Sequence, residues 1–173
     1  TLSLHDALPI YFTYRVGFNL SDSQAKITKY DLNPDGNIGD HYVGEKIGEI
    51  WGFVTDGFYS TDEEAAGVDN SDIWGGKWLA GDVRYKNLNG DKTADGKDII
   101  SKGHSKLQDP GDRKIIGNNT ARYNYGISLS AEYKNFDFSC LMQGVGKRDL
   151  MLGGAYFWGF TDEWRTPTTE QLD

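Results

Sequence analysis

Apolar and polar residues alternate without a break from Arg122 to Tyr133. Twelve residues with a period of two predict a β-strand that has one apolar and one polar side. After Lys134-Asn135 the alternation resumes, and the sequence therefore predicts a long β-hairpin in whose turn Asn135 would tolerate a positive φ. The apolar side would carry Tyr123, Tyr125, Ile127, Leu129, Ala131 and Tyr133 of the first strand and Phe136, Phe138, Cys140 and Met142 of the second.

A third long strand is predicted from Tyr11 to Leu20, where apolar residues again take alternate positions. The pattern between this strand and the hairpin is less regular. It predicts a turn over 21–24 and short strands over 25–30 and 83–88. It also predicts one strand over 47–59, bent at its glycines. Ser60-Thr61 followed by acidic residues predicts a capped short helix through Ala66, and 89–119 is expected to be a long irregular connection.

Two kinds of protein contain such hairpins. In a soluble sandwich the apolar side packs on a second sheet, and strands usually end after about five or six residues. In an outer-membrane barrel the apolar side contacts lipid, and a tilted strand needs about 9–11 residues to cross. The length of these strands, and the tyrosines at both ends of 122–133, fit the barrel, but the pattern alone leaves both classes open.

The segment GDRKIIGNNTARYNYGISLSAEYKNFDFSCLMQGVGKRD resembles the late barrel region of SusC/RagA-type TonB-linked outer-membrane transporters. That family has an Asp-Arg pair, an Ile-Gly-Asn, an aromatic-rich strand, a Tyr-Lys-Gly-Phe-Asp-Phe turn and a Gly-Val-Gly-Lys-Arg-Asp close. Asn135 stands where the turn glycine is usual. Upstream IGEIWGFVTDGFYSTDEEA and GDVRYKNLNGD, and downstream FWGFTDEW, also fit, so the resemblance covers Gly44 to the last residue.

The resemblance implies an all-β fold: an antiparallel transmembrane barrel of about 22 strands. This chain would supply about five or six of these strands with long extracellular loops, as a partial barrel over 11–173 without the plug domain. The implied function is import of oligosaccharides or peptides through the outer membrane of a Gram-negative, Bacteroidetes-type cell. A SusD-like surface lipoprotein would cap the barrel, and the TonB complex would supply energy through the plug. The turn at Lys134-Asn135 would face the periplasm.

The first ten residues, TLSLHDALPI, match the in-frame translation of a common sequencing-adapter sequence. We therefore expect residues 1–10 to be an artefact outside the fold. Residues 11–173 would then form one partial barrel domain.

The net charge and the hydrophobic content of the chain argue against two further possibilities, nucleic-acid binding and a transmembrane helix. The 173 residues carry a net charge of −8 and are 38 % hydrophobic. Binding to nucleic acid needs clustered Lys and Arg, so this acidic balance argues against it. The sequence contains no run of about 18 apolar residues, so no transmembrane helix is predicted. A barrel is still compatible with the sequence, because apolar and polar residues alternate along barrel strands. The single cysteine, Cys140, has no partner for an internal disulfide and is expected to be apolar filler.

A calcium-binding loop is one candidate site. An EF-hand-type loop needs oxygen ligands at positions 1, 3, 5, 9 and 12 and a glycine at position 6. The pattern from Asn87 to Asp98 supplies the oxygens, but its first position is a neutral amide and its sixth is Lys92, and both weaken a site. A solvated loop rich in Asn and Asp is the alternative. The candidate ligands are Asn87, Asn89, Asp91, Asp95 and Asp98.

The tryptophans are the other candidates, because flat aromatic side chains in loops can stack on sugar rings or peptide side chains. Trp51, inside a predicted strand, is expected to face lipid or an interfacial belt instead. The loop tryptophans could equally be interfacial anchors or loop cores. The candidate substrate-binding residues are Trp74, Trp78, Trp158 and Trp164.

An enzyme is not predicted. The acidic residues that occur in pairs, Asp62-Glu63 and Asp162-Glu163, are adjacent in sequence, and adjacency does not give the separation that a catalytic pair of carboxylates needs. No nucleotide-binding or nucleophile motif occurs in the sequence. Two alternatives to the transporter remain: a soluble secreted β-domain that binds glycans, with or without calcium, and a β-sheet hydrolase. An apolar hairpin side covered by another sheet would favour the soluble domain, whereas a continuous exposed apolar belt would favour the transporter.

Overall fold

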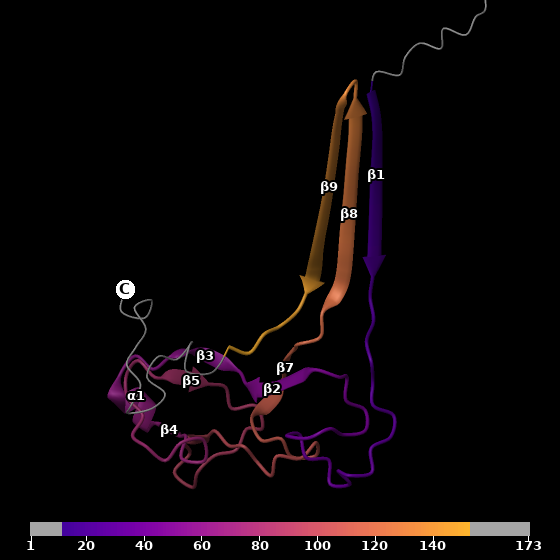
Figure 1. Cartoon of the computed structure of the whole chain (residues 1–173). Coiled ribbons are helices and arrows are strands. Elements are labelled where there is room, and N and C mark those ends of the chain that lie inside the picture. Colours follow the sequence, from indigo (N-terminus) through magenta and orange to yellow (C-terminus); the bar gives the residue numbers. More distant parts are fainter. Residues whose placement is uncertain (1–11, 153–173) are drawn as a thin grey trace, which may run out of the picture. The chain divides into compact units, whose positions relative to one another are not determined.

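The computed structural model describes residues 12–152, which form two units (Figure 1). The first, termed the sheet unit, comprises residues 12–24 and 120–148. The second, termed the loop unit, comprises residues 25–119 and 149–152. No helix in this part of the chain is long and apolar enough to cross a membrane.

The sheet unit consists of three long antiparallel strands in the order β1-β8-β9. Their bounds are Phe12–Ser21 for β1, Arg122–Tyr133 for β8 and Phe136–Lys147 for β9. These are the three strands that the alternation predicts, and all three are long because the alternation continues for 10 to 12 residues. Because β1 pairs with β8, residues 25–119 of the loop unit are inserted in sequence between two neighbouring strands.

The register places the apolar residues of the three strands on one face, because directly opposed residues project to the same side. Phe18 is opposite Ile127, which is opposite Met142. This face is open to solvent: Phe18 is 67 % and Phe138 is 59 % exposed. From one end to the other, its rows are Phe12–Tyr133–Phe136, Tyr14–Ala131–Phe138, Val16–Leu129–Cys140, Phe18–Ile127–Met142 and Leu20–Tyr125–Gly144.

The opposite face is mainly polar. Arg15 is opposite Ser130, which is opposite Ser139, and Glu132 is opposite Asp137. Leu141 is the largest apolar side chain that the register places on this side. The sheet therefore has one continuous apolar face and one mainly hydrophilic face, as predicted.

The hairpin turn is correctly located but its backbone differs from the prediction. Tyr133 and Phe136 are opposed, so Lys134 and Asn135 form a two-residue turn. The positive φ falls on Lys134, at 54°, and not on Asn135. A two-residue hairpin turn of the II′ kind needs positive φ only at its first residue, which explains this placement.

The loop unit contains three small sheets and one short helix. β2 (Glu49–Phe53) pairs with β7 (Arg113–Asn118), and β3 (Thr55–Phe58) pairs with β5 (Val83–Tyr85), both antiparallel. β4 (Val68–Asp69) and β6 (Asp98–Ile99) form a two-residue parallel pair. α1 (Asp62–Ala66) is the predicted helix: the Thr61 hydroxyl accepts from the Glu64 N–H, and the Glu64 carboxylate accepts from the Ser60 N–H.

Several predictions for this region are wrong. Segment 25–30 makes only an isolated bridge, between Lys26 and Lys46, and segment 47–59 is two strands with different partners. The predicted strand over 83–88 ends at Tyr85, and 89–119 contains β6 and β7. Among the described residues three strands are ten or more residues long, whereas the loop-unit strands are two to six residues long and pair with one another.

A buried carboxylate organises the core of the loop unit. Asp112 is 0 % exposed and accepts the backbone N–H groups of Leu88, Asn89 and Ser101, at 2.6, 3.1 and 2.7 Å. It thereby joins the residues after β5, the residues after β6 and the start of β7. Tyr59, Ala65 and Ile100 are the most deeply buried apolar side chains of this core.

Candidate functional site

Aromatic rings form a chain across the loop unit. The Trp74 and Trp78 centroids are 6.1 Å apart, and the Trp78 and Tyr85 centroids 6.3 Å apart, both edge to face. Tyr85 in turn lies 5.3 Å from Phe53. The Trp78 indole N–H donates to the Trp74 carbonyl at 3.1 Å, which fixes the two tryptophans relative to each other. Trp74 is 60 % exposed and so presents a flat apolar surface to solvent.

Two of the four predicted substrate-contacting tryptophans are therefore brought together, and Tyr85 and Phe53 extend the group. The spacing of four residues between Trp74 and Trp78 could be seen in the sequence, whereas the contact with Tyr85 depends on the pairing of β3 with β5. Trp158 and Trp164 lie outside the described residues.

The predicted calcium ligands lie in one loop but are largely bonded to one another. The Asn87 side-chain amide donates to the Asp91 carbonyl at 2.7 Å, and its oxygen accepts from the Gly90 N–H at 2.6 Å. The Asn89 amide donates to the Asp91 carboxylate at 2.8 Å.

The last predicted calcium ligand, Asp98, is paired with Lys92. The Lys92 ammonium lies 3.2 Å from Asp98 Oδ1, so a cation from the chain itself neutralises this carboxylate. Asp95 is exposed. Among residues 12–152, no three Asp, Glu, His or Cys side chains converge in a way that could hold a metal. Calcium binding at this loop remains a prediction.

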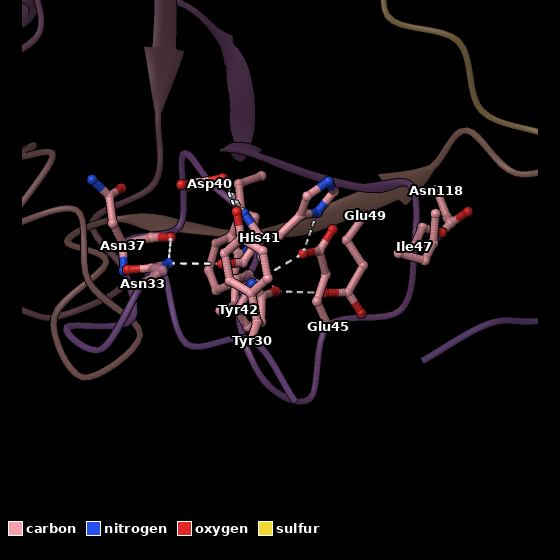
Figure 2. Close-up of polar contacts among 11 residues, drawn as sticks. Tyr30, Asn33, Asn37, Asp40, His41, Tyr42, Glu45, Ile47, Glu49 and Asn118 are labelled. Atoms are coloured by element: carbon pink, nitrogen blue, oxygen red, sulfur yellow. Dashed lines mark hydrogen bonds and ion pairs between the residues drawn. The ribbon is translucent and has the colours of Figure 1, made fainter. Parts of the chain in front are cut away.

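A network of hydrogen bonds surrounds Tyr42 in the loop unit, and no sequence pattern predicted it (Figure 2). The Tyr42 hydroxyl donates to Glu49 Oε2 at 2.5 Å and accepts from the Trp51 indole N–H at 3.1 Å. Burial, followed by the hydrogen bond to the Glu49 carboxylate, raises the pKa of Tyr42 to about 12. The hydroxyl therefore stays protonated and fixes both neighbours. Trp51, expected to face lipid or an interfacial belt, takes part in this network through its indole N–H.

A second carboxylate holds the backbone beside this network. Glu45 Oε2 lies 3.0 Å from His41 Nδ1 and accepts the Tyr42 N–H at 3.3 Å. These bonds span three to four residues, so a sequence signal existed in the form of a His-Tyr-x-x-Glu spacing. Nothing in the sequence placed Glu49 and Trp51 against the same hydroxyl.

A cavity of about 460 Å³ adjoins the Tyr42 network. Two charged side chains, Glu49 and Arg113, line it together with the indole of Trp51. Its other walls are mainly apolar. They comprise Ile38, Gly39, Ile50, Leu150 and Met151, with Asn119.

In the sheet unit, an ion pair joins the end of β1 to the start of β8, between which residues 25–119 are inserted. The Arg122 guanidinium, at the start of β8, donates through two nitrogens to both carboxylate oxygens of Asp22, just after β1. The two residues are 100 positions apart in sequence. The side-chain hydrogen bond from Arg122 is the main cause that lowers the pKa of Asp22.

No family model and no curated protein matches the chain. Function is therefore inferred from the residues and their geometry.

Proposed function

We propose that the chain is part of a TonB-linked outer-membrane transporter of the SusC/RagA type. The observation that carries this proposal is the continuous, exposed apolar face of β1, β8 and β9. Soluble monomers seldom leave an apolar surface of this extent uncovered, so such a face indicates contact with lipid or with another protein surface. Its mainly polar reverse side suits a water-filled or plugged barrel interior.

The dimensions of the sheet support a membrane-spanning role. Strands of 10 to 12 residues match the length that a tilted strand needs to cross the hydrocarbon region, about 9–11 residues. Aromatic side chains stand at both ends of the apolar face: Phe12, Tyr133 and Phe136 at one, and Tyr125 at the other. Outer-membrane barrels carry such rings at both interfaces.

The connections between the strands favour one orientation of the proposed barrel. One end of the sheet has a two-residue turn, and the other end leads into the loop unit. Because outer-membrane barrels have short periplasmic turns and long extracellular loops, Lys134 would face the periplasm and the loop unit would lie outside the cell. A SusD-like lipoprotein would then cover the extracellular side, and the TonB complex would act through the plug region.

The transported substrate would be an oligosaccharide or a peptide. The exposed Trp74, backed by Trp78, offers a stacking surface on the extracellular unit. This surface also favours the second candidate function, a secreted β-domain that binds glycans, in which the apolar face of the sheet would have to be covered by a partner sheet.

The native single cysteine allows a direct test. Cys140 lies on the apolar face and Ser139, beside it on β9, on the polar face. A fluorescent probe on Cys140 of the chain in lipid vesicles should be quenched by lipids that carry a nitroxide in the acyl chain and protected from aqueous iodide. The matched control, Ser139→Cys in a Cys140→Ser background, should show the reverse.

Equal quenching at the two positions would refute the membrane proposal. If iodide reached neither probe and nitroxide lipid quenched neither, the apolar face would be covered by protein, and the soluble β-domain would be preferred.

A further inference from the structure

The cavity beside the Tyr42 network combines fixed charges of opposite sign with an apolar wall. At about 460 Å³ it falls in the range of small-molecule sites, about 300–1,000 Å³. All of its lining residues belong to the loop unit, so it is a feature of that unit alone.

The negative charge comes from Glu49, whose orientation is fixed by a neutral partner. One carboxylate oxygen accepts the Tyr42 hydroxyl at 2.5 Å. Tyr42 is 6 % exposed, so the bond is held from the interior of the unit and the carboxylate cannot rotate freely. Among the described residues no Lys, Arg or His lies within ion-pair distance of Glu49. Its charge is therefore available to a cation in the cavity.

The positive charge comes from Arg113, which is likewise held by neutral groups. Its Nε donates to the Pro110 carbonyl at 3.2 Å, and its Nη2 donates to the Lys102 carbonyl at 2.6 Å and the Ser105 hydroxyl at 2.8 Å. In the part of the chain that the structure describes, no carboxylate pairs with this guanidinium. A half-buried arginine without a counter-ion favours an anionic ligand group.

The sheet register sets the distance between the two charges. Glu49 is opposite Asn118 and Phe53 is opposite Arg113, so four residues of β2 separate the two positions along the paired strands β2 and β7. At about 3.3 Å per residue this is roughly 13 Å between the two backbone positions, and side chains as long as those of Glu49 and Arg113 can bring their charged groups closer together than that. An extended tripeptide places its terminal ammonium and carboxylate about 10 Å apart.

We propose that this cavity binds a short peptide, with its terminal ammonium at Glu49, its carboxylate at Arg113 and its side chains against the apolar wall. Trp51 and Ile50, which follow Glu49 in β2, are among the residues that line the cavity. A neutral oligosaccharide could stack on Trp51, but it would leave both charges without a counter-ion. The chemistry of the cavity therefore favours a ligand that carries one charge of each sign.

The test uses the whole chain in detergent and calorimetric titration with trialanine, its N-acetylated form and its C-amidated form. Trialanine should bind, and each block should weaken binding about tenfold. Glu49→Gln, which keeps the hydrogen bond from Tyr42, should remove the sensitivity to N-acetylation alone. Arg113→Gln should remove the sensitivity to C-amidation alone, whereas a merely structural role would weaken all three peptides equally.

Two further variants serve as controls. Arg113→Lys keeps the charge and should retain discrimination against the amide, even if the loops that Arg113 joins are loosened. Lys114→Gln, the neighbouring exposed position, should behave like the unaltered chain in every titration.

The proposal is overturned if trialanine does not bind, if its doubly blocked form binds equally well, or if neutral maltotriose displaces it. The titration does not depend on membrane insertion. A titration without peptide binding would therefore refute the peptide site but not the transporter proposal. A negative cysteine-probe result would refute the transporter proposal but not the peptide site.

Discussion

Removing the Asp112 carboxylate should destabilise the loop unit far more than removing an exposed carboxylate from the same unit. The Asp112 oxygens accept three backbone N–H groups from two separate segments. A hydrogen bond to a charged group contributes about 1.5–3 kcal/mol. Because Leu88 and Asn89 lie near solvent, water can accept hydrogen bonds from their N–H groups once the carboxylate is removed. This replaces part of the lost stabilising free energy.

We therefore expect Asp112→Ala to lower the free energy of unfolding by about 3–5 kcal/mol. Asp112→Asn keeps one acceptor oxygen and should cost about 1–3 kcal/mol. Urea denaturation followed by tryptophan fluorescence measures the free energy, and amide hydrogen exchange locates the loss. Exchange should accelerate first at Leu88, Asn89 and Ser101.

Asp95→Ala is the matched control, because it removes an exposed carboxylate from the same region and should change stability by less than about 0.5 kcal/mol. If Asp112→Ala unfolded within about 1 kcal/mol of the unaltered chain, the carboxylate would not be the organising group inferred from its hydrogen bonds. Unchanged exchange at the three amides would lead to the same conclusion.

Two further predictions concern pH. The folded-state pKa of Tyr42, about 12, is above its ordinary value of 10.0, so its contribution to stability is complete below pH 10 and is lost as the pH rises toward 12. Tyr42→Phe should lack this part of the alkaline decline in denaturation experiments, and parallel declines would contradict the prediction. The pKa of Asp22 is lowered, so its pairing with Arg122 stabilises above the ordinary value of 3.8 and is lost as the pH falls. Asp22→Asn should lower the melting temperature at neutral pH but not in acid that protonates Asp22, and an equal loss at both pH values would exclude this ion pair as the cause.

The sequence predicted the residue types of the candidate sites but not all of their contacts. Trp74 and Trp78 are loop aromatics that the sequence predicts to be exposed, and the spacing of four residues between them is compatible with their contact. The spacing of oxygens in Asn87, Asp91 and Asp98 did not predict that the Asn87 amide would donate to both aspartates or that Lys92 would pair with Asp98. The cavity residues Glu49 and Arg113 carry no local pattern, because only the pairing of β2 with β7 brings them to one wall.

The amino-acid sequence by itself determined β1, β8, β9 and α1, including which side of each long strand is apolar. These features are local: alternation sets the faces of a strand, and a capping residue sets the start of a helix. Only the tertiary structure decided that β1 pairs with β8 across the intervening segment, that β7 is a strand, and that Asp112 joins three segments. Such choices depend on which backbone edges and polar groups meet after the chain has folded, and no short window of sequence contains both partners.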